Sequence, residues 1–372
     1  MFNNITNPGT LVMSGNPVIF TGHTNIVYYT DTEGEEKKRL FSRVLGKFEG
    51  KVDGTALYTE EYTYPLGEDG NFQFDLSSAL EECFRQLRTA TINADGPQHT
   101  PKVVTYTLRL TEMWVDDGVT YEGDTVTIGK TAGETAGTVA DGEPEGTVAD
   151  EDQQPIYKAI AGALTDAERV RLANSDVAAL LTVGKLLSRK PQTSEVVVKD
   201  SLFIAPYWNG TVPTYNRSKR SALGVFKVQG RDFYVTENDG QFFPMVFWNQ
   251  FGMLESVVGH ALPTYKHNLK SSQYEVDSQR TFHSIGEQHA QTSLQQQEIT
   301  LSTGIVDRRW YEWWIAEVLT TPQVFVKLEG EWYSGTIVPE SSITRKTDKG
   351  DALSIEFKVK LSVRGSIYNS WV

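Results

Sequence analysis

The histidine and cysteine residues of this sequence, which most often coordinate transition metals, are few and scattered. Six histidines are present, and the two closer pairs, His260/His267 and His283/His289, lack the i, i+4 spacing that places two imidazoles on one helical face. The one cysteine, Cys83, cannot form a thiolate cluster or an internal disulfide. A metal site would have to be assembled by the fold alone, with carboxylates such as Glu287 nearby. The sequence therefore predicts no metal ligand and no cofactor.

A phosphate-binding loop is suggested by Gly129-Lys130-Thr131, but its context does not fit. The motif requires a glycine five residues before Gly129, and Asp124 stands there, with Gly123 one place too early. The segment also leads into an acidic stretch rather than a helix, so the helix N-terminus that would hold a phosphate is not expected. We predict no nucleotide site here.

Hydrolytic chemistry has equally little support. No G-x-S-x-G elbow occurs in the chain. The pair Asp116-Asp117 could supply glycosidase carboxylates, but such carboxylates need fixed separations in space, and a solvated loop is the simpler interpretation. The eight tryptophans, sixteen tyrosines and seventeen phenylalanines leave open a carbohydrate-binding face, although most fall at apolar positions typical of a core. The sequence predicts no catalytic residue.

Charge and hydropathy exclude further classes of partner. The net charge is -13, which disfavours nucleic acid and anionic membrane surfaces because both are bound through lysine and arginine. No run of about 18 apolar residues predicts a transmembrane helix, and the first twenty residues do not read as a signal peptide. We expect a globular protein made in the cytoplasm, with no nucleic-acid partner and no membrane insertion.

The elements of the first third read as short strands with one covering helix. Residues 17–20, 26–30, 41–48, 57–64 and 102–115 are rich in β-branched and aromatic residues and are separated by turn residues, and we take 102–115 as the last strand of this unit. Asp75 is the expected N-cap of a helix whose apolar stripe includes Leu80 and Cys83. On that stripe Cys83 is a packing residue rather than a nucleophile.

The middle of the chain changes in composition. Residues 131–157 contain no lysine or arginine, and the sequence GTVAD occurs twice, at 137–141 and 146–150. Such a segment buries little, so we predict an exposed acidic loop. Thr165 and Glu168 form a capping box that predicts a helix continuing to Lys190. The insert at 131–190 is either a solvated linker and lid or a contact with a neighbouring molecule.

The last part of the chain is predicted to be a second β-region. Residues 224–235 and 241–248 flank Asp239-Gly240 as a hairpin, and 323–329 and 332–338 form another. The polar segment 271–297 is expected to be extended or at a sheet edge. A helix is predicted at 307–319, with several tryptophans on one side. Residues 353–363 alternate apolar and polar side chains, which indicates a strand with one buried face.

We therefore predict a mainly β protein with two antiparallel, sandwich-like domains and short covering helices. The predicted boundaries are 1–128 for the N-terminal β-domain, 129–194 for the acidic loop and helical insert, and 195–372 for the C-terminal β-domain with its tryptophan-rich helix.

Several turn and strand patterns resemble tail or baseplate-type structural proteins in phages and prophages of Bacteroidetes bacteria. The resemblance covers residues 10 to 115 and 225 to 366, and the patterns that carry it are Gly15-Asn16-Pro17-Val18-Ile19, Phe72-Gln73-Phe74-Asp75-Leu76, Phe247-Trp248-Asn249-Gln250-Phe251-Gly252, Leu301-Ser302-Thr303-Gly304, residues 313–326, and Leu361-Ser362-Val363-Arg364. It implies a β-sandwich-type subunit in a ring around the tail, with no active site.

The expected function is thus a non-enzymatic virion subunit that forms a ring with copies of itself and contacts other tail proteins. The insert at 131–190 is the expected contact. A carbohydrate-binding or adhesin-like module that contacts a host surface glycan through exposed Trp and Tyr is the alternative. A hydrolase whose site is assembled only in the fold stays as a third hypothesis.

Overall fold

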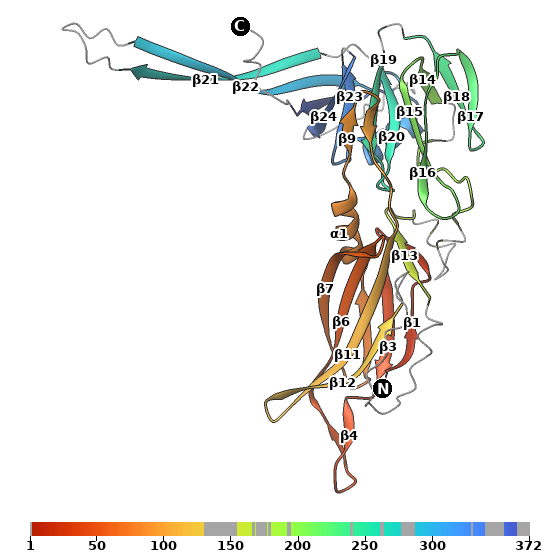
Figure 1. Cartoon of the computed structure of the whole chain (residues 1–372), viewed down its shortest axis with the longest axis vertical. Coiled ribbons are helices and arrows are strands. Elements are labelled where there is room, and N and C mark those ends of the chain that lie inside the picture. The colour runs from red at the N-terminus through yellow and green to blue at the C-terminus, as the bar shows by residue number, and fades with distance from the viewer. Residues whose placement is uncertain are drawn as a thin grey trace, which may run out of the picture.

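A computed structural model of the whole chain shows a long molecule with two β-rich bodies and a projecting arm (Figure 1). The residues that it describes are 2–129, 155–165, 168, 177, 180–191, 195–238, 240, 242–260, 264–276, 287–328, 330–338 and 353–362. The described elements confirm a mainly β fold with several antiparallel sheets. None of the helices in these ranges is long and apolar enough to cross a membrane.

The N-terminal body is built from two sheets that enclose one core. Their orders are β1-β3-β8 and β2-β13-β11-β6-β7. The strands are β1 (Phe2–Thr6), β3 (Ile19–Thr24) and β8 (Asn71–Asp75) in the small sheet, and β2 (Leu11–Met13), β13 (Tyr157–Ile160), β11 (Val104–Asp116), β6 (Leu40–Val52), β7 (Thr55–Pro65) and β12 (Val119–Ile128), which pairs with β11, in the large one.

Alternation along these strands places aromatic and aliphatic side chains between the sheets. In β3, Phe20 is buried while its neighbours are half-buried, and in β11 Tyr106, Leu108 and Leu110 are buried on one face. Period-two alternation of this kind is what a sheet with one covered face requires. The two-sheet arrangement confirms the sandwich-like character that the alternation predicts.

Helix α1 (Ser77–Leu87) closes one end of this core (Figure 1). Its buried stripe contains Leu80 and Cys83, so the prediction of a packed cysteine is confirmed. The predicted N-cap is wrong by one residue, because Leu76 occupies that position without a side-chain cap. The Asp75 carboxylate nevertheless accepts hydrogen bonds from the N–H groups of Ser77 at 3.0 Å and Val18 at 3.1 Å, and thereby joins the helix start to β3.

The large sheet is completed by strands that the sequence did not indicate. Strand β12 follows β11, so residues 102–115 are not the last strand of the unit. Strand β13, placed by sequence reasoning within the insert, lies parallel to β2 and antiparallel to β11. Of the predicted acidic segment at 131–157, residues 131–154 with the repeat lie outside the described residues, and its last residue, Tyr157, begins β13.

The capping box predicted at Thr165 is formed, but the helix does not reach Lys190. The Glu168 carboxylate accepts a hydrogen bond from the Thr165 N–H at 2.9 Å, and the Thr165 hydroxyl accepts one from the Glu168 N–H at 3.3 Å. Residues 181–191 are irregular, and the Leu187 N–H donates to Pro206 O, which makes this part a strap along β15 rather than a helix. Tertiary pairing with β15 replaces the helical hydrogen bonds there.

The C-terminal body is organised around a sheet of order β20-β19-β23-β24-β25-β22-β21. Its strands are β20 (Leu254–His260), β19 (Phe242–Trp248), β23 (Val324–Leu328), β24 (Glu331–Val338), β25 (Glu356–Leu361), β22 (Glu287–Ser302) and β21 (Thr264–Val276). Two smaller sheets lie beside it. One is two-stranded, formed by β15 (Leu202–Trp208) and β16 (Pro213–Lys219), and the other is three-stranded, formed by β14 (Glu195–Val198), β18 (Arg231–Thr236) and β17 (Gly224–Val228).

Strand β19 is buried on both faces, which accounts for its continuous apolar sequence. Met245 and Phe247 pack in the cluster under the helix, whereas Val246 and Trp248 pack in a second cluster with β15. The hairpin predicted around Asp239-Gly240 is wrong. Strand β17 turns into β18 at residues 229 and 230, both with positive φ, and β19 pairs with β20 and β23 instead.

The tryptophan-rich helix covers one face of the main sheet. It comprises α3 (Arg308–Trp313) and a π-helical segment, η3 (Trp314–Val318), and the Asp307 carboxylate caps it by accepting from the Trp310 N–H at 2.9 Å. Trp313 and Trp314 are buried against Phe247 and Phe357 respectively. The hairpin of β23 and β24 is confirmed.

The last predicted strand is shorter than its alternation. Strand β25 covers Glu356–Leu361, and Leu353 forms an isolated bridge with Val306. Ile355, Phe357, Val359 and Leu361 are buried, as the alternation predicts.

A small hairpin of β9 (Thr91–Asn93) and β10 (Gly96–Gln98) fastens the first body to the second. The Arg217 guanidinium donates to Pro97 O at 2.7 Å and to Asp95 O at 2.6 Å. Gly96 has a φ of +100°, and a Cβ there would lie 2.6 Å from Leu202, so only glycine fits this close approach. The two bodies are thus joined by contacts as well as by the chain.

Candidate functional site

The arm formed by β21 and β22 is the most prominent projection of the molecule (Figure 1). The two strands pair from Thr264↔Thr300 to Val276↔Glu287, whereas β25 pairs only with Gln297–Ser302 of β22. Among the described strands, β21 has no partner on its other side. The predicted extended or edge character of 271–297 is confirmed for the described part of that segment.

The opposite end of the molecule carries an exposed aromatic cluster, which we call the tip cluster. It is formed where β6 begins and where two hairpins project: β4 (Tyr28–Thr30) with β5 (Glu36–Lys38), and β11 with β12 (Figure 1). Its members are Tyr28, Tyr29, Arg39, Leu40, Phe41, Trp114, Val119 and Tyr121.

Stacking orders the tip cluster without burying it. The Arg39 guanidinium lies 4.1 Å from the centre of the Trp114 ring, and Trp114 stacks on Tyr121 with a centroid separation of 5.9 Å. Phe41 is 74% exposed and has a φ of +52°, at a bulge where the register between β6 and β11 shifts. A bulky residue in this conformation is uncommon and marks a site under constraint.

The third feature is a cavity of about 510 Å³ between the two bodies, which we call the junction cavity. Met13 and Leu164 line it from the N-terminal side, and Phe251, Trp313 and Glu317 from the C-terminal side. Residues 162 to 164 are held to the first body, because Gly162 O accepts from Gly15 N–H at 2.7 Å and Leu164 N–H donates to the Asn16 side chain at 2.8 Å.

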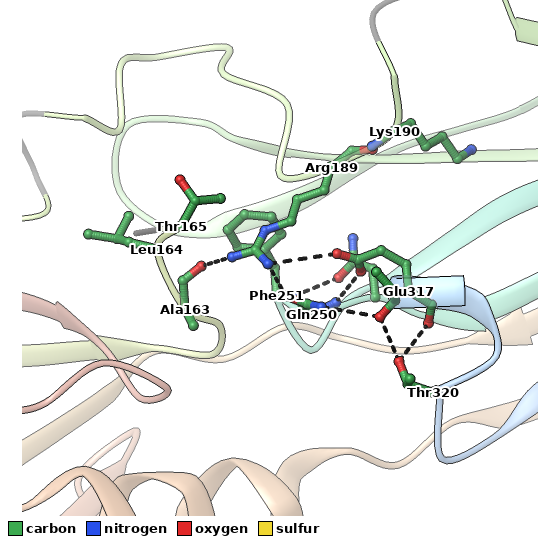
Figure 2. Close-up of polar contacts among 12 residues, drawn as sticks. Ala163, Leu164, Thr165, Arg189, Lys190, Gln250, Phe251, Glu317 and Thr320 are labelled. Carbon is green, nitrogen blue, oxygen red and sulfur yellow. Dashed lines mark hydrogen bonds and ion pairs between the residues drawn. The ribbon is translucent and has the colours of Figure 1, made fainter. Parts of the chain in front are cut away.

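Arg189 crosses the junction cavity from one body to the other (Figure 2). Its guanidinium donates to Ala163 O on one side and to the Gln250 side chain on the other, and one Nη lies 3.9 Å from Glu317 Oε1. The other oxygen of Glu317 accepts from the Gln250 N–H at 3.1 Å. Burial raises the pKa of Glu317 to about 7, with the nearby Glu255 carboxylate acting in the same direction.

Next to Arg189, the strap buries a second group of charges. Lys190 is 6% exposed, and its ammonium lies 2.5 Å from Glu195 and 3.5 Å from Glu255. Arg231 lies 3.6 Å from the other oxygen of Glu195. Burial raises the pKa of Glu195, while the two cations oppose that rise. Buried charges are tolerated only when paired in this way, so the group fixes the strap to the second body.

The residues first considered for chemistry are not brought together. Asp116 is the last residue of β11 and Asp117 begins the turn to β12, and both are exposed. Gly129 has a positive φ and packs against Tyr157, which gives this glycine a packing role, while Lys130 and Thr131 lie outside the described residues. The thiol of Cys83 is buried, and burial raises its pKa to about 12.

The described histidines lie apart as well. His99 packs edge-on against Trp248, and His260 against Phe242. The side chains of His267, His283 and His289 are outside the described residues. Within the described ranges, no group of three or more His, Cys, Asp or Glu side chains is placed to hold a metal ion.

Sequence reasoning missed the residues of the junction cavity. Arg189, Gln250 and Glu317 are far apart in the chain, and only the packing of the strap brings them together. One signal was present, since Glu317 follows Trp313 by four residues and so falls on the apolar side of the predicted helix. A carboxylate in an apolar stripe indicates a buried charge with a specific partner.

No protein-family model, no curated protein and no solved structure matches this chain.

Proposed function

We propose that this chain is a non-enzymatic structural subunit of a phage tail or baseplate, where it forms a ring with copies of itself and supports virion assembly or host attachment. The observation that carries the proposal is the β21–β22 arm, which projects from the body and leaves a 13-residue edge without a partner among the described strands. The resemblance of the turn and strand patterns to tail proteins supports the same function.

The physics of an isolated ribbon supports an intermolecular role for the arm. Two strands alone are marginally stable in water, and an unpaired edge is a template for a further strand. Addition of a neighbour's strand would satisfy the free backbone groups and order the arm. We propose that the arm contacts a different surface of the neighbouring copy, and contacts of that kind close into rings when the rotation between subunits permits.

The arm can be removed without breaking the sheet, because the register fixes where to cut. Joining His267 to Gln297, which face each other in the ladder, through a short Asn-Gly turn keeps the pairing of β22 with β25. We expect the intact chain to form a closed oligomer and the shortened chain to stay monomeric, measured by mass photometry and negative-stain microscopy.

A matched control shortens the β4–β5 hairpin in the same way, by joining Tyr28 to Lys38. This variant should retain the ring. A ring of unchanged size in the arm-shortened variant, or an intact chain that is monomeric at every concentration, would contradict the proposal.

The tip cluster favours a second candidate, an adhesin-like contact with a host surface glycan. Exposed aromatic rings ordered by stacking offer the flat apolar faces to which sugar rings bind. Tyr121 and Tyr234 are both 44% exposed, and only Tyr121 lies in the tip cluster. Binding on a glycan array that is lost in Tyr121→Ala and kept in Tyr234→Ala would support this role. Equal binding by both variants would exclude the tip cluster as the glycan-binding site.

A further inference from the structure

A row of exposed apolar side chains, which we call the flank row, crosses the three-stranded sheet of β14, β18 and β17. Val196 and Val225 face Tyr234 from the two neighbouring strands, and cross-strand partners point to the same side of a sheet. These side chains are 41%, 56% and 44% exposed respectively. Phe233 and Val197 pack on β15 from the opposite side of the sheet, so the flank row lies on its outer face. A single exposed apolar residue is ordinary, whereas a contiguous row marks a contact surface.

The flank row ends at a free edge of this sheet. Residues 229 and 230 form the two-residue turn between β17 and β18, so Val228 and Arg231 close the hairpin as a hydrogen-bonded pair. Such pairs alternate along an antiparallel ladder, and the backbone N–H and C=O groups of Val225 and Lys227 therefore face away from β18. No described strand pairs with that side of β17. The edge is open to a strand from another molecule.

Two other long strands with a free edge fit a contact with the arm less well. Strand β7 ends the large sheet of the first body, but Tyr62 and Tyr64 turn inward against Phe74, and helix α1 packs beside this strand. Strand β12 carries part of the tip cluster, at the far end of the molecule from the arm (Figure 1).

The arm and the strands β17 and β18 lie on opposite sides of the second body, at the same end of the molecule (Figure 1). A closed ring relates its copies by rotation alone, whereas an added shift along the axis gives an open helix. In a ring whose axis follows the long axis of the molecule, the arm of one copy therefore meets the neighbour at the level of its second body. The flank row lies at that level and the tip cluster does not.

We propose that β21 of one copy adds beside β17 of the next copy and lies along the flank row. The proposal rests on the ring function proposed above and names the surface that receives the arm. Strand β17 has 5 residues, whereas the free edge of β21 has 13, so strand pairing alone supplies few hydrogen bonds. The flank row supplies the apolar surface whose burial stabilises the contact.

Val225→Lys tests this surface by placing a new charge at the free edge, where a lysine opposes the addition of a strand. Lys227 on the same edge is already matched by Asp232 at 3.5 Å. By mass photometry, Val225→Lys should be monomeric at a concentration at which the intact chain forms a closed oligomer. Val119→Lys is the matched control, because Val119 is 54% exposed and lies on a strand of the tip cluster, and this variant should form the oligomer. Circular dichroism shows whether both variants are folded.

A second measurement keeps the test decisive if Val225→Lys folds poorly. The photoreactive residue benzoylphenylalanine at position 225 should cross-link, on irradiation of the assembled chain, to residues 264–276 of a second copy. Mass spectrometry of the product with twice the mass of the chain identifies the linked segment. The same residue at position 119 should give no link to the arm.

The outcomes separate this surface from the ring itself. A folded Val225→Lys variant that still forms the ring would overturn the proposal, as would cross-links from position 225 only within one chain or to a segment of the second copy other than the arm. If the arm-shortened chain is then monomeric, the ring function stands and another surface receives the arm. An intact chain that is monomeric at every concentration would overturn both proposals.

Discussion

Replacement of Glu317 by glutamine should stabilise the protein at alkaline pH and leave it unchanged at acidic pH. The pKa of this carboxyl is about 7 in the folded chain and 4.5 in the unfolded one, because burial penalises the charged form. The difference corresponds to about 3 kcal/mol of folding free energy. Because the folded pKa is the higher one, this stability is present below pH 4.5 and is lost as the pH rises through 7.

The substitution tests this pH-dependent contribution of Glu317 to the free energy of folding, and it changes few other contacts. A glutamine side-chain oxygen can still accept from the Gln250 N–H, and the Arg189 guanidinium lies 3.9 Å away and keeps its bonds to Ala163 and Gln250. Urea denaturation followed by circular dichroism at about pH 5 and about pH 8 measures the free energy of unfolding of both chains. We expect Glu317→Gln to be more stable by up to about 3 kcal/mol at the higher pH only.

Glu312→Gln is the matched control on the same helix. Glu312 pairs with Arg308 on the surface, where solvent screens such pairs, so this variant should differ little from the parent at either pH. A stability difference between Glu317→Gln and the parent that is the same at both pH values would refute the reasoning. It would mean that Glu317 is ionised in the folded chain at neutral pH.

Three further perturbations test other parts of the structure. Lys190→Met leaves Glu195 and Glu255 without their shared cation, and should cost about 3–5 kcal/mol in urea denaturation, whereas Lys227→Met at an exposed ion pair should cost less than about 0.5 kcal/mol. Gly96→Ala should lower the melting temperature and increase proteolysis between the bodies, because its φ is +100° and its Cβ would overlap Leu202. Unchanged proteolysis would mean that the β9–β10 hairpin does not hold the two bodies together. Cys83 should react with a disulfide reagent only in denaturant, since burial raises its pKa to about 12, and rapid labelling of the folded chain would contradict this burial.

Local patterns predicted the elements of this fold better than their pairing. Alternation identified β11 and β25, and spacing identified α1, because both follow from which face of an element is buried. The Asp239-Gly240 hairpin was wrong because a turn sequence does not reveal which strands lie beside it. The hairpin turn lies instead at residues 229 and 230, between β17 and β18, and the other side of β18 pairs with β14.

The junction cavity could not be predicted for a related reason. Its walls come from β2, the strap, the loop after β19 and the tryptophan-rich helix, and no local pattern reports contacts between such distant segments. The strap itself was predicted as helix because the capping box at Thr165 is followed by apolar residues at helical spacing as far as Leu187, and tertiary contacts with β15 override that pattern. The sequence did place Glu317 within the apolar stripe of the predicted helix, which indicates a buried carboxylate at this position.

The position of β13 between β2 and β11 has a consequence for how the protein is made. Among the described strands, β2 joins the large sheet through β13 alone, yet the two strands are separated in the sequence by more than a hundred residues. A growing chain on the ribosome therefore carries β2 without its neighbour until residue 160 has emerged. Synthesis at about 5–20 residues per second makes this an interval of about 7 to 30 seconds, during which the nascent first body exposes an incomplete sheet to which chaperones can bind.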